Sequence, residues 1–291
     1  MLDGIIVKGV GGFYYVKTSQ GVIESRARGV FREDKLTPLV GDKVKIRISE
    51  EDNTGYVVEV LPRTSQLSRP PVANITQAIV VMSIRKPKIN TWLLDKFLIM
   101  AEYENLDIII CLNKSDLDEE DIMKYKRIYE NVGYKVLITN IEEPIGIDQL
   151  KEELLDHVSV FAGPSGVGKS SLLNEIKPEL ELEIGDVSLR TERGKHTTRH
   201  VELLELGNNS YVLDSPGFSS LNLDFIEDET IVRRLFPEIY KYGTECKFQS
   251  CLHDKEPGCA VKIYVDEDII CSSRYENYIS LLNEVKNIRR Y

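Results

Sequence analysis

The 291-residue sequence predicts a multidomain protein whose central α/β domain follows a small β-barrel and precedes a helical segment. Three observations support this architecture. Short strand patterns punctuated by glycine fill residues 1–70. Apolar strands alternate with helical patterns across residues 71–224, and from residue 225 to 291 helical stretches flank a group of cysteines.

The first segment, residues 1–70, contains about five strand patterns, and the alternation is clearest in KVKIRI at 43–48. Several short strands in so short a segment favour a small antiparallel barrel. We expect an OB-fold, a barrel that commonly binds oligonucleotides and here would bind RNA. An SH3-like barrel is the alternative. The stretch LSRPPVANITQ at 67–77 marks the end of this domain with prolines.

The second segment, residues 71–224, alternates apolar strands with helical patterns. AIVVMSI at 78–84, DIIICL at 107–112 and VSVFA at 158–162 are apolar along almost their whole length. Such strands are typical of a parallel sheet that helices cover on both faces. RHVELLEL and NSYVLD, within 199–214, are expected to add a hairpin of two strands.

A phosphate-binding loop lies in the middle of the chain. Gly163 to Ser170, GPSGVGKS, fits G-x-x-x-x-G-K-[ST] between a predicted strand and a predicted helix. Its glycines let backbone N–H groups turn toward phosphates, and Lys169 is expected to reach the β and γ phosphates while Ser170 ligates Mg²⁺. The alternative is a chance glycine turn. The predicted contacts come from Gly163, Pro164, Ser165, Gly166, Val167, Gly168, Lys169, Ser170 and Ser171.

A candidate base-reading motif, Asn113-Lys114-Ser115-Asp116, follows the apolar strand DIIICL. The Asp116 carboxylate can accept hydrogen bonds from the N1–H and 2-amino groups of guanine, and adenine offers neither, so rejection of ATP by a factor of ~10⁴ is expected. Asn113 is expected to tie this loop to the phosphate loop, and the stem of Lys114 to cover the base. A plain surface turn is the alternative.

Two further segments resemble the switch regions of GTPases. Asp214-Ser215-Pro216-Gly217 follows a strand, and D-x-x-G places a carboxylate in the second shell of Mg²⁺ and a glycine N–H at the γ phosphate. A plain turn is the alternative here too. The segment RGKHTTRH offers Thr197 and Thr198, one of which is expected to ligate Mg²⁺. Thr198 is slightly favoured, and the pattern does not decide between them.

The candidate catalytic residue is His196. Many GTPases carry a glutamine after D-x-x-G that orients the attacking water, whereas this chain has Phe218, which cannot do so. Intrinsic hydrolysis is therefore expected to be slow. His196 is a candidate to position the water once a partner orders its loop, and a merely solvated histidine is the alternative.

The order of these motifs is rotated, because the base-reading motif precedes the phosphate loop. Sites on parallel sheets are assembled from loops at strand ends, so their chemistry depends on where the loops lie and not on chain order. The order therefore predicts a circularly permuted P-loop GTPase domain over residues 71–224. Thr139 and Asn140 stand where a Ser-Ala loop usually contacts guanine O6, which leaves that contact open.

The cysteine group predicts a structural zinc site. Three thiolates and one imidazole within a short span can close a tetrahedral site around zinc, which leaves no position for substrate. The predicted ligands are Cys246, Cys251, His253 and Cys259. Unliganded reduced thiols are the alternative. Zinc would stabilise residues 225–291, a helical segment too small to fold alone.

Composition limits the location and the partners. The chain is 42% hydrophobic and 29% charged, lacks an apolar run near the ~20 residues that span a bilayer, and has no secretion signal, so we expect a cytoplasmic protein without a membrane partner. The net charge of −10 argues against a generally basic RNA binder. Residues 1–70 nevertheless carry eleven Lys/Arg against nine Asp/Glu, which favours RNA contacts near the ends over the middle, unless these are solvated faces. A monomer is the default.

The sequence resembles the circularly permuted ribosome small subunit-dependent GTPases, the RsgA family. The resemblance covers the whole chain and rests on NKSD, GPSGVGKSS, GKHTTRH, DSPGF and the Cys-Cys-His-Cys cluster, in that order. It implies an N-terminal OB-fold, a permuted GTPase core, a zinc domain and Mg²⁺ with GTP. It also implies GTP hydrolysis stimulated by the small ribosomal subunit and its rRNA, during late maturation of that subunit. His196 matches the histidine of the family's G-[RK]-H-T-T segment.

Two other functions stay open at this point. The protein could be an RNA-binding assembly factor whose GTP/GDP site acts only as an affinity switch. It could also be an ATP-using P-loop enzyme such as a kinase, which the carboxylate of Asp116 argues against.

Overall fold

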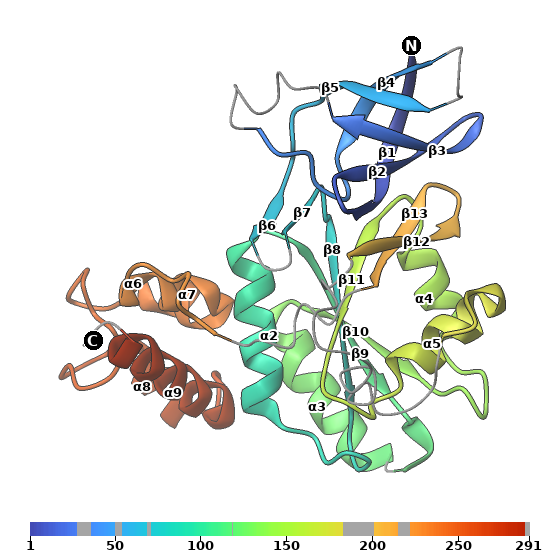
Figure 1. The fold of residues 1–291 in the computed structure, drawn as a ribbon. Coiled ribbons are helices and arrows are strands. Elements are labelled where there is room, and N and C mark those ends of the chain that lie inside the picture. The colour runs from blue at the N-terminus through green and yellow to red at the C-terminus, as the bar shows by residue number, and fades with distance from the viewer. Residues whose placement is uncertain are drawn as a thin grey trace. The chain divides into compact units, whose positions relative to one another are not determined.

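The computed structural model describes residues 1–27, 36–49, 54–68, 71–117, 119–182, 201–214 and 222–288 (Figure 1). Among these residues no helix is long and apolar enough to cross a membrane. The chain forms two compact units. The first comprises Met1–Ala78, Asp148–Phe161 and Ser170–Ser219, and the second comprises Ile79–Ile147, Ala162–Lys169 and Ser220–Tyr291.

The first unit contains a closed five-stranded barrel. Its strands are β1 (Leu2–Val10), β2 (Phe13–Thr18), β3 (Gly21–Ala27), β4 (Lys43–Ile48) and β5 (Gly55–Val60). The pairs β1–β2, β2–β3, β4–β5 and β1–β4 are antiparallel, and β3–β5 is parallel, so the ring closes. Every second residue of β4 near its centre is buried, because Val44 and Ile46 face the barrel core with Ile6, Val16 and Val57. The predicted barrel is therefore confirmed.

The barrel is joined to further strands of the same unit. β12 (Glu202–Gly207) and β13 (Ser210–Asp214) form the predicted hairpin, and β13 pairs in parallel with β11 (Val158–Ala162). β1 pairs with β12 at Lys8 and Glu202, whose side chains form an ion pair of 2.7 Å. A short hairpin of β6 (Gln66–Ser68) and β7 (Pro71–Ala73) follows the barrel.

The second unit contains three adjacent strands in the order β8 (Gln77–Ser83), β9 (Asp107–Asn113) and β10 (Lys135–Thr139). Helix α2 (Thr91–Tyr103) follows β8 in the chain, and α3 (Glu119–Val132) follows β9. β9 and β10 are parallel and end in register at Asn113 and Thr139. The predicted alternation of apolar strands and helices is confirmed. It places the carboxyl ends of β9 and β10 side by side.

The C-terminal part of the second unit is helical, as expected. It consists of α6 (Glu229–Val232), the 3₁₀ turn η5 (Arg233–Leu235), α7 (Pro237–Gly243), α8 (Ala260–Asp266) and α9 (Ser272–Ile288). These elements lie beside α2 (Figure 1). Ile99 of α2 shares one buried cluster with Phe236, Tyr278 and Leu281, so α2 and the C-terminal helices have a common core.

A buried arginine fixes the packing of these helices. Arg274 of α9 is 1% exposed, and its guanidinium forms ion pairs with Asp95 of α2 and with Glu238 of α7, the latter at 2.7 Å. Tyr129 of α3 donates to the Asp95 carboxylate at 2.9 Å. Burial raises the pKa of Asp95, whereas the charges of Asp95 and Glu238 outweigh burial and raise the pKa of Arg274 well above its ordinary value.

Candidate nucleotide-binding site and metal centre

The phosphate loop connects β11 to helix α5 (Lys169–Ile176), the context that the motif requires. Gly163 and Gly168 have φ angles of +139° and +98°. A Cβ at Gly163 would lie 2.1 Å from the Val81 carbonyl oxygen, and one at Gly168 would lie 2.5 Å from Nδ2 of Asn113. Both positions therefore require glycine, for backbone conformation and for space.

The ammonium group of Lys169 folds back over this loop. Its Nζ donates to the carbonyl oxygens of Gly163 at 2.7 Å and Pro164 at 2.8 Å. Burial lowers the pKa of Lys169, because the charged form loses hydration. Among the side chains that the structure describes, no carboxylate pairs with this ammonium. A half-buried cation beside a glycine loop and a helix start suits an anionic ligand such as a phosphate.

Asn113 ties the base-reading loop to the phosphate loop. It is the last residue of β9 and 1% exposed, and its Nδ2 donates to the Val167 carbonyl oxygen at 2.8 Å. Lys114 has φ +62°, and its Nζ donates to the carbonyl oxygens of Gly166 at 2.7 Å and Lys86 at 2.6 Å. The expected connection between the two loops is thus present. Ser115 and Asp116 follow in the short 3₁₀ turn η1 (Ser115–Leu117), with Asp116 exposed.

Thr139 supports this connection in a way that the sequence pattern did not indicate. Its hydroxyl donates to Oδ1 of Asn113 at 3.0 Å and lies 3.1 Å from the sulfur of Cys111. Thr139 is fully buried, and Cys111, whose thiol pKa burial raises to about 12, is inert. The register of β10 beside β9 could have suggested this contact. Asn140, also buried, uses its Oδ1 to accept from the Glu142 N–H.

The predicted switch segments fall mostly outside the described part of the chain. His196, Thr197, Thr198 and Gly217 lie outside the described residues. Asp214 ends β13, but its side chain is not described. Ser170 and Ser171 lie in the first turn of α5.

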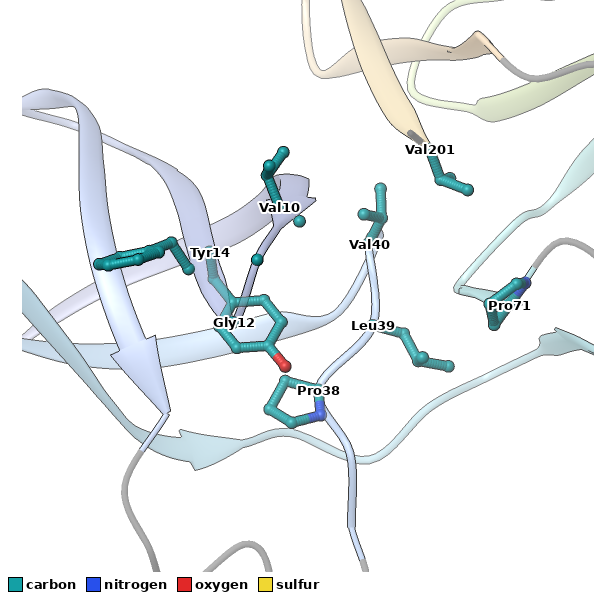
Figure 2. Close-up of a pocket in the computed structure, with 11 residues that line it drawn as sticks. Val10, Gly12, Tyr14, Pro38, Leu39, Val40, Pro71 and Val201 are labelled. Carbon is teal, nitrogen blue, oxygen red and sulfur yellow. The ribbon is translucent and has the colours of Figure 1, made fainter. Parts of the chain in front are cut away.

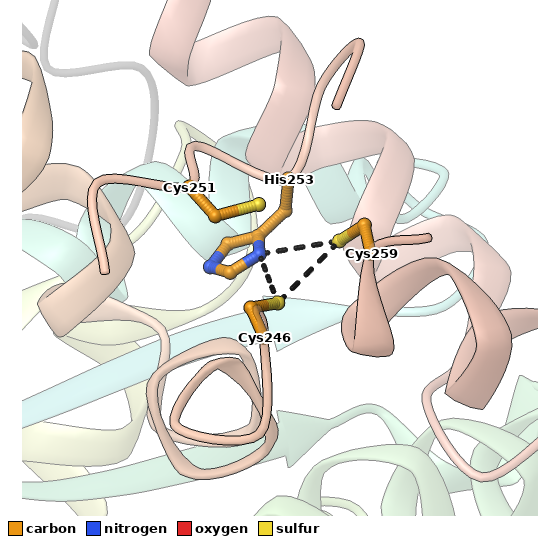
Figure 3. A group of neighbouring side chains, drawn as sticks. All are labelled: Cys246, Cys251, His253 and Cys259. Carbon is orange, nitrogen blue, oxygen red and sulfur yellow. Dashed lines mark hydrogen bonds between the residues drawn. The ribbon is translucent and has the colours of Figure 1, made fainter. Parts of the chain in front are cut away.

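The four predicted zinc ligands come together in the second unit (Figure 3). Nδ1 of His253 lies 3.4 Å from the Cys246 sulfur and 3.3 Å from the Cys259 sulfur, and these two sulfurs are 3.8 Å apart. Zn–S bonds of about 2.3 Å in a tetrahedron place sulfurs about 3.8 Å apart, so the spacing fits zinc. With Cys251, whose sulfur completes the group within 4.8 Å, this Cys₃His cluster can bind zinc.

Burial sets the charge of this cluster. It raises the pKa of the Cys251 thiol to about 12 and, together with the charge of Arg233, lowers the pKa of His253 to about 4. His253 is therefore neutral near pH 7 and can donate a lone pair to a metal. Thiolates at such a buried position need a cation beside them, which Zn²⁺ supplies when it is bound.

Residues around the cluster hold its loop in place. Arg233 donates to the carbonyl oxygens of Gln249 and Cys251, and the hydroxyls of Tyr275 and Tyr278 donate to those of His253 and Leu252. These contacts satisfy the backbone of a loop with little regular structure. Three cysteines and one histidine within a short span predicted this cluster, but no sequence pattern pointed to these supporting residues.

The barrel carries a separate cavity of about 250 Å³ (Figure 2). The end of β1 lines it with Val10 and the start of β2 with Tyr14, and Leu39, Pro71 and Val201 complete its mostly apolar wall. Burial raises the pKa of Tyr14, and the negative charge of Asp42 raises it further. No predicted site residue lies in this cavity.

A family model described as RsgA GTPase matches residues 60–224, which contain the phosphate loop and the base-reading motif, and a model of the RsgA N-terminal domain matches residues 3–57.

This chain belongs to the RsgA GTPase family.

Family membership identifies the chain as a GTP-hydrolysing enzyme and implies Mg²⁺ with GTP. Two relatives carry the name small ribosomal subunit biogenesis GTPase RsgA. The one from Alkaliphilus metalliredigens is 47% identical, and the one from Clostridium acetobutylicum is 46% identical; each comparison covers 100% of both chains. The resemblance to this family that the motifs indicated is confirmed.

Two solved structures of similar proteins support the fold. The crystal structure of YloQ, a circularly permuted GTPase, superimposes with a TM-score of 0.83 at 39% identity, and covers 99% of this chain and 96% of its own. YjeQ from Thermotoga maritima gives a TM-score of 0.84 at 36% identity, with 97% and 98% coverage. The predicted fold class is therefore confirmed: an N-terminal barrel, a circularly permuted GTPase fold and a C-terminal Cys₃His cluster.

Proposed function

We propose that this protein binds GTP and GDP, and that the small ribosomal subunit stimulates its hydrolysis of GTP during late maturation of that subunit. One observation carries the proposal. The side chains of Asn113 and Lys114 donate hydrogen bonds to the phosphate loop, and these bonds hold the base-reading motif beside that loop. The relatives' name, small ribosomal subunit biogenesis GTPase, supports the choice of partner.

In this proposal the described residues have distinct tasks. Asp116 accepts from the N1–H and 2-amino groups of guanine, and the stem of Lys114 covers the base. The backbone of residues 163–168 and the ammonium of Lys169 hold the phosphates. The hydroxyl of Ser170 would hold Mg²⁺, which when bound neutralises charge that develops on the phosphates.

The remaining tasks fall on segments outside the described residues or at their edge. Thr198, or Thr197, would complete the Mg²⁺ ligands. The Asp214 carboxylate would lie in the second shell of Mg²⁺, and the Gly217 N–H would contact the γ phosphate. His196 would position the attacking water, because Phe218 follows D-x-x-G where other GTPases use glutamine.

The proposal also includes the domain boundaries, the oligomeric state, the location and the partners of the protein. Residues 1–70 form the RNA-binding barrel, residues 71–224 the permuted GTPase domain and residues 225–291 the zinc-binding helical domain. The protein acts as a monomer in the cytoplasm, contacts rRNA of the small subunit and has no membrane partner. Small subunits are assembled in the bacterial cytoplasm, and the relatives named above are bacterial.

The test is GTP turnover with and without purified small ribosomal subunits, for the unsubstituted protein and for His196→Ala. We expect slow turnover alone, strong stimulation by subunits, and loss of about 10²–10⁴-fold of the stimulated rate in His196→Ala. Large subunits are the control and should not stimulate. Equal rates with and without small subunits would contradict the proposal. Subunit binding and maturation that continue normally in a variant without turnover would favour the affinity-switch alternative.

A further inference from the structure

A basic turn lies next to the nucleotide-binding loops. It consists of Arg85, Lys86, Pro87 and Lys88, and it connects the end of β8 to α2. Arg85, Lys86 and Lys88 are all exposed. Nothing in the nucleotide chemistry proposed above requires these three cations.

Local hydrogen bonds hold the turn in place. The Ile89 N–H donates to the Ile84 carbonyl oxygen at 3.0 Å, and Arg85 and Lys88 form an isolated antiparallel bridge. The Lys86 N–H donates to the Ser83 hydroxyl at 3.3 Å. A turn held at its base and across its middle presents its exposed side chains in a defined place, which lowers the entropy cost of binding a partner.

The turn is also attached to the nucleotide-binding loops. Nζ of Lys114 donates both to the Lys86 carbonyl oxygen, at 2.6 Å, and to the Gly166 carbonyl oxygen, at 2.7 Å. A Cβ at Gly166 would meet Pro87 at 3.9 Å, so the ring of Pro87 lies beside the phosphate loop. One side chain thus connects three segments: the base-reading loop, the phosphate loop and the basic turn.

Two of the lysines in the turn, Lys86 and Lys88, differ from other lysines of the described molecule in their charge partners. Lys8, Lys17, Lys45 and Lys96 each form an ion pair with a carboxylate, as expected in a chain of net charge −10. Neither Lys86 nor Lys88 pairs with a carboxylate among the residues that the structure describes. Two unpaired exposed ammonium groups on a rigid turn favour an anionic partner.

The chemistry of the turn favours RNA over protein. Protein interfaces draw most of their affinity from buried aromatic and apolar side chains, and the turn exposes no large hydrophobic residue. Phosphate contacts need only well-placed cations. We propose that the basic turn binds backbone phosphates of RNA in the small ribosomal subunit, and that Lys114 couples this contact to the nucleotide. This inference rests on the function proposed above.

The coupling follows from the position of Lys114. Whatever orders the two nucleotide loops also fixes the Lys86 carbonyl, and a phosphate that fixes the turn helps to fix Lys114. Coupling of this kind is reciprocal, so subunits should tighten GTP binding by the same factor by which GTP tightens subunit binding.

The experiment compares Lys88→Glu with Lys124→Glu, an exposed lysine of α3 that undergoes the same change of charge. Lys86 is left unchanged because its carbonyl holds Lys114. Affinity for purified small subunits is measured by sedimentation at several salt concentrations, with a non-hydrolysable GTP analogue. We expect Lys88→Glu to weaken binding about tenfold and to lower the salt slope by about one, while Lys124→Glu and Lys88→Arg stay within about twofold of the unsubstituted protein.

Two further measurements separate the possible outcomes. GTP affinity without subunits should be unchanged in Lys88→Glu. A photo-crosslinker at position 88 should form adducts with rRNA, and adducts with ribosomal proteins alone would overturn the inference. Equal losses in Lys88→Glu and Lys124→Glu would overturn it as well. If the unsubstituted protein neither binds small subunits nor is stimulated by them, the proposed function is wrong and the inference falls with it; if it binds them and Lys88→Glu binds equally, only the inference falls.

Discussion

Asn113 shows how one buried amide can organise a site. Its Nδ2 donates to the phosphate loop at Val167, and its Oδ1 accepts from Thr139 on the neighbouring strand. Each end of the amide therefore has a protein partner, while the second hydrogen of Nδ2 and the second lone pair of Oδ1 stay available for further bonds. Asn113 acts by holding the loop that carries Asp116, so the base-reading carboxylate keeps its place relative to the phosphates.

Asp116→Asn tests base recognition directly. An amide nitrogen cannot accept from the N1–H and 2-amino groups of guanine, so we expect affinity for GTP to fall by about 10³-fold or more. Affinity for xanthosine triphosphate should rise, because its 2-oxo group can accept from the new amide. Competition against a fluorescent GTP analogue gives the affinities, with Glu120→Gln on α3 as the control. If ATP competes as well as GTP for the unsubstituted protein, the assignment of Asp116 is wrong.

At this scale the sequence predicted residues with local signatures and missed residues that act through contacts. The glycines, Lys169 and Asn113 belong to patterns of fixed spacing, because phosphate binding requires that spacing. Thr139 and the Lys86 carbonyl belong to no pattern. Each acts on a residue 26 or 28 positions away, and only the fold brings those atoms together.

At the scale of elements, helices α2 and α9 are packed closely against each other. They share the buried cluster around Ile99 and Leu281, and they are joined by Arg274 and Asp95 and by the ion pair of Lys96 with Glu284. α9 therefore packs on the helix that follows β8, and the C-terminal helices do not form an independent core.

Arg274→Ala should be strongly destabilising. It leaves the carboxylates of Asp95 and Glu238 buried without their cation, and breaking such a buried group costs about 3–5 kcal/mol of unfolding free energy. Urea unfolding followed by circular dichroism measures the change. Arg127→Ala, at an exposed position of α3, should alter stability by less than about 0.5 kcal/mol. Similar stabilities for the two variants would show that the arginine contributes little.

Hydrophobic patterns predicted the elements well where they are long and uniform. β8 is buried at every residue and α9 runs for 17 residues, so both periods are clear in the sequence. The first helical stretch after residue 225, DETIVRRLFPEIYKY, is not one helix, because it is divided into α6, η5 and α7. Phe236 is extended, with φ −115° and ψ 99°, because a residue before proline avoids the helical region. The partner of Arg274, 179 positions away, could not be read from a helical pattern.

For the whole molecule, the cysteine cluster is part of the core of the second unit. Cys251 and Cys259 are buried in the same cluster as Phe236, Tyr278 and Ile99. A change at the zinc ligands therefore affects the packing of α2 as well as the loop that carries them.

Removal of zinc should destabilise the second unit as a whole. We expect about one zinc ion per chain. Chelation should lower the melting temperature and weaken the helical circular dichroism signal, because the binding energy at a structural site contributes to folding. Elemental analysis and thermal unfolding before and after chelation, with zinc added back, test this. Cys259→Ser should lose the metal, whereas Cys271→Ser, outside the cluster, should retain it. Full metal content in Cys259→Ser would contradict the assignment.

The rotated motif order predicted that distant loops would meet, and Asn113 and Val167 do meet across 54 positions. The pairing of β1 with β12 was not predicted. This pairing joins residues 194 positions apart. The hydrophobic pattern of each strand is ordinary, alternating or mixed, and does not indicate which strand lies beside it.

That pairing has a practical consequence for anyone who wishes to study the parts separately. Cutting away the first sixty or so residues, with the aim of isolating the catalytic core, would strip β12 of its neighbour and of the lysines that neutralise Glu202 and Glu205. The fragment would then expose β12 as an unpaired, negatively charged edge strand. The free N–H and C=O groups of such a strand can pair with other chains and cause aggregation. Defects of a truncated protein would therefore reflect a damaged remainder as much as a missing RNA contact, and point substitutions on the barrel surface are the cleaner way to separate the two.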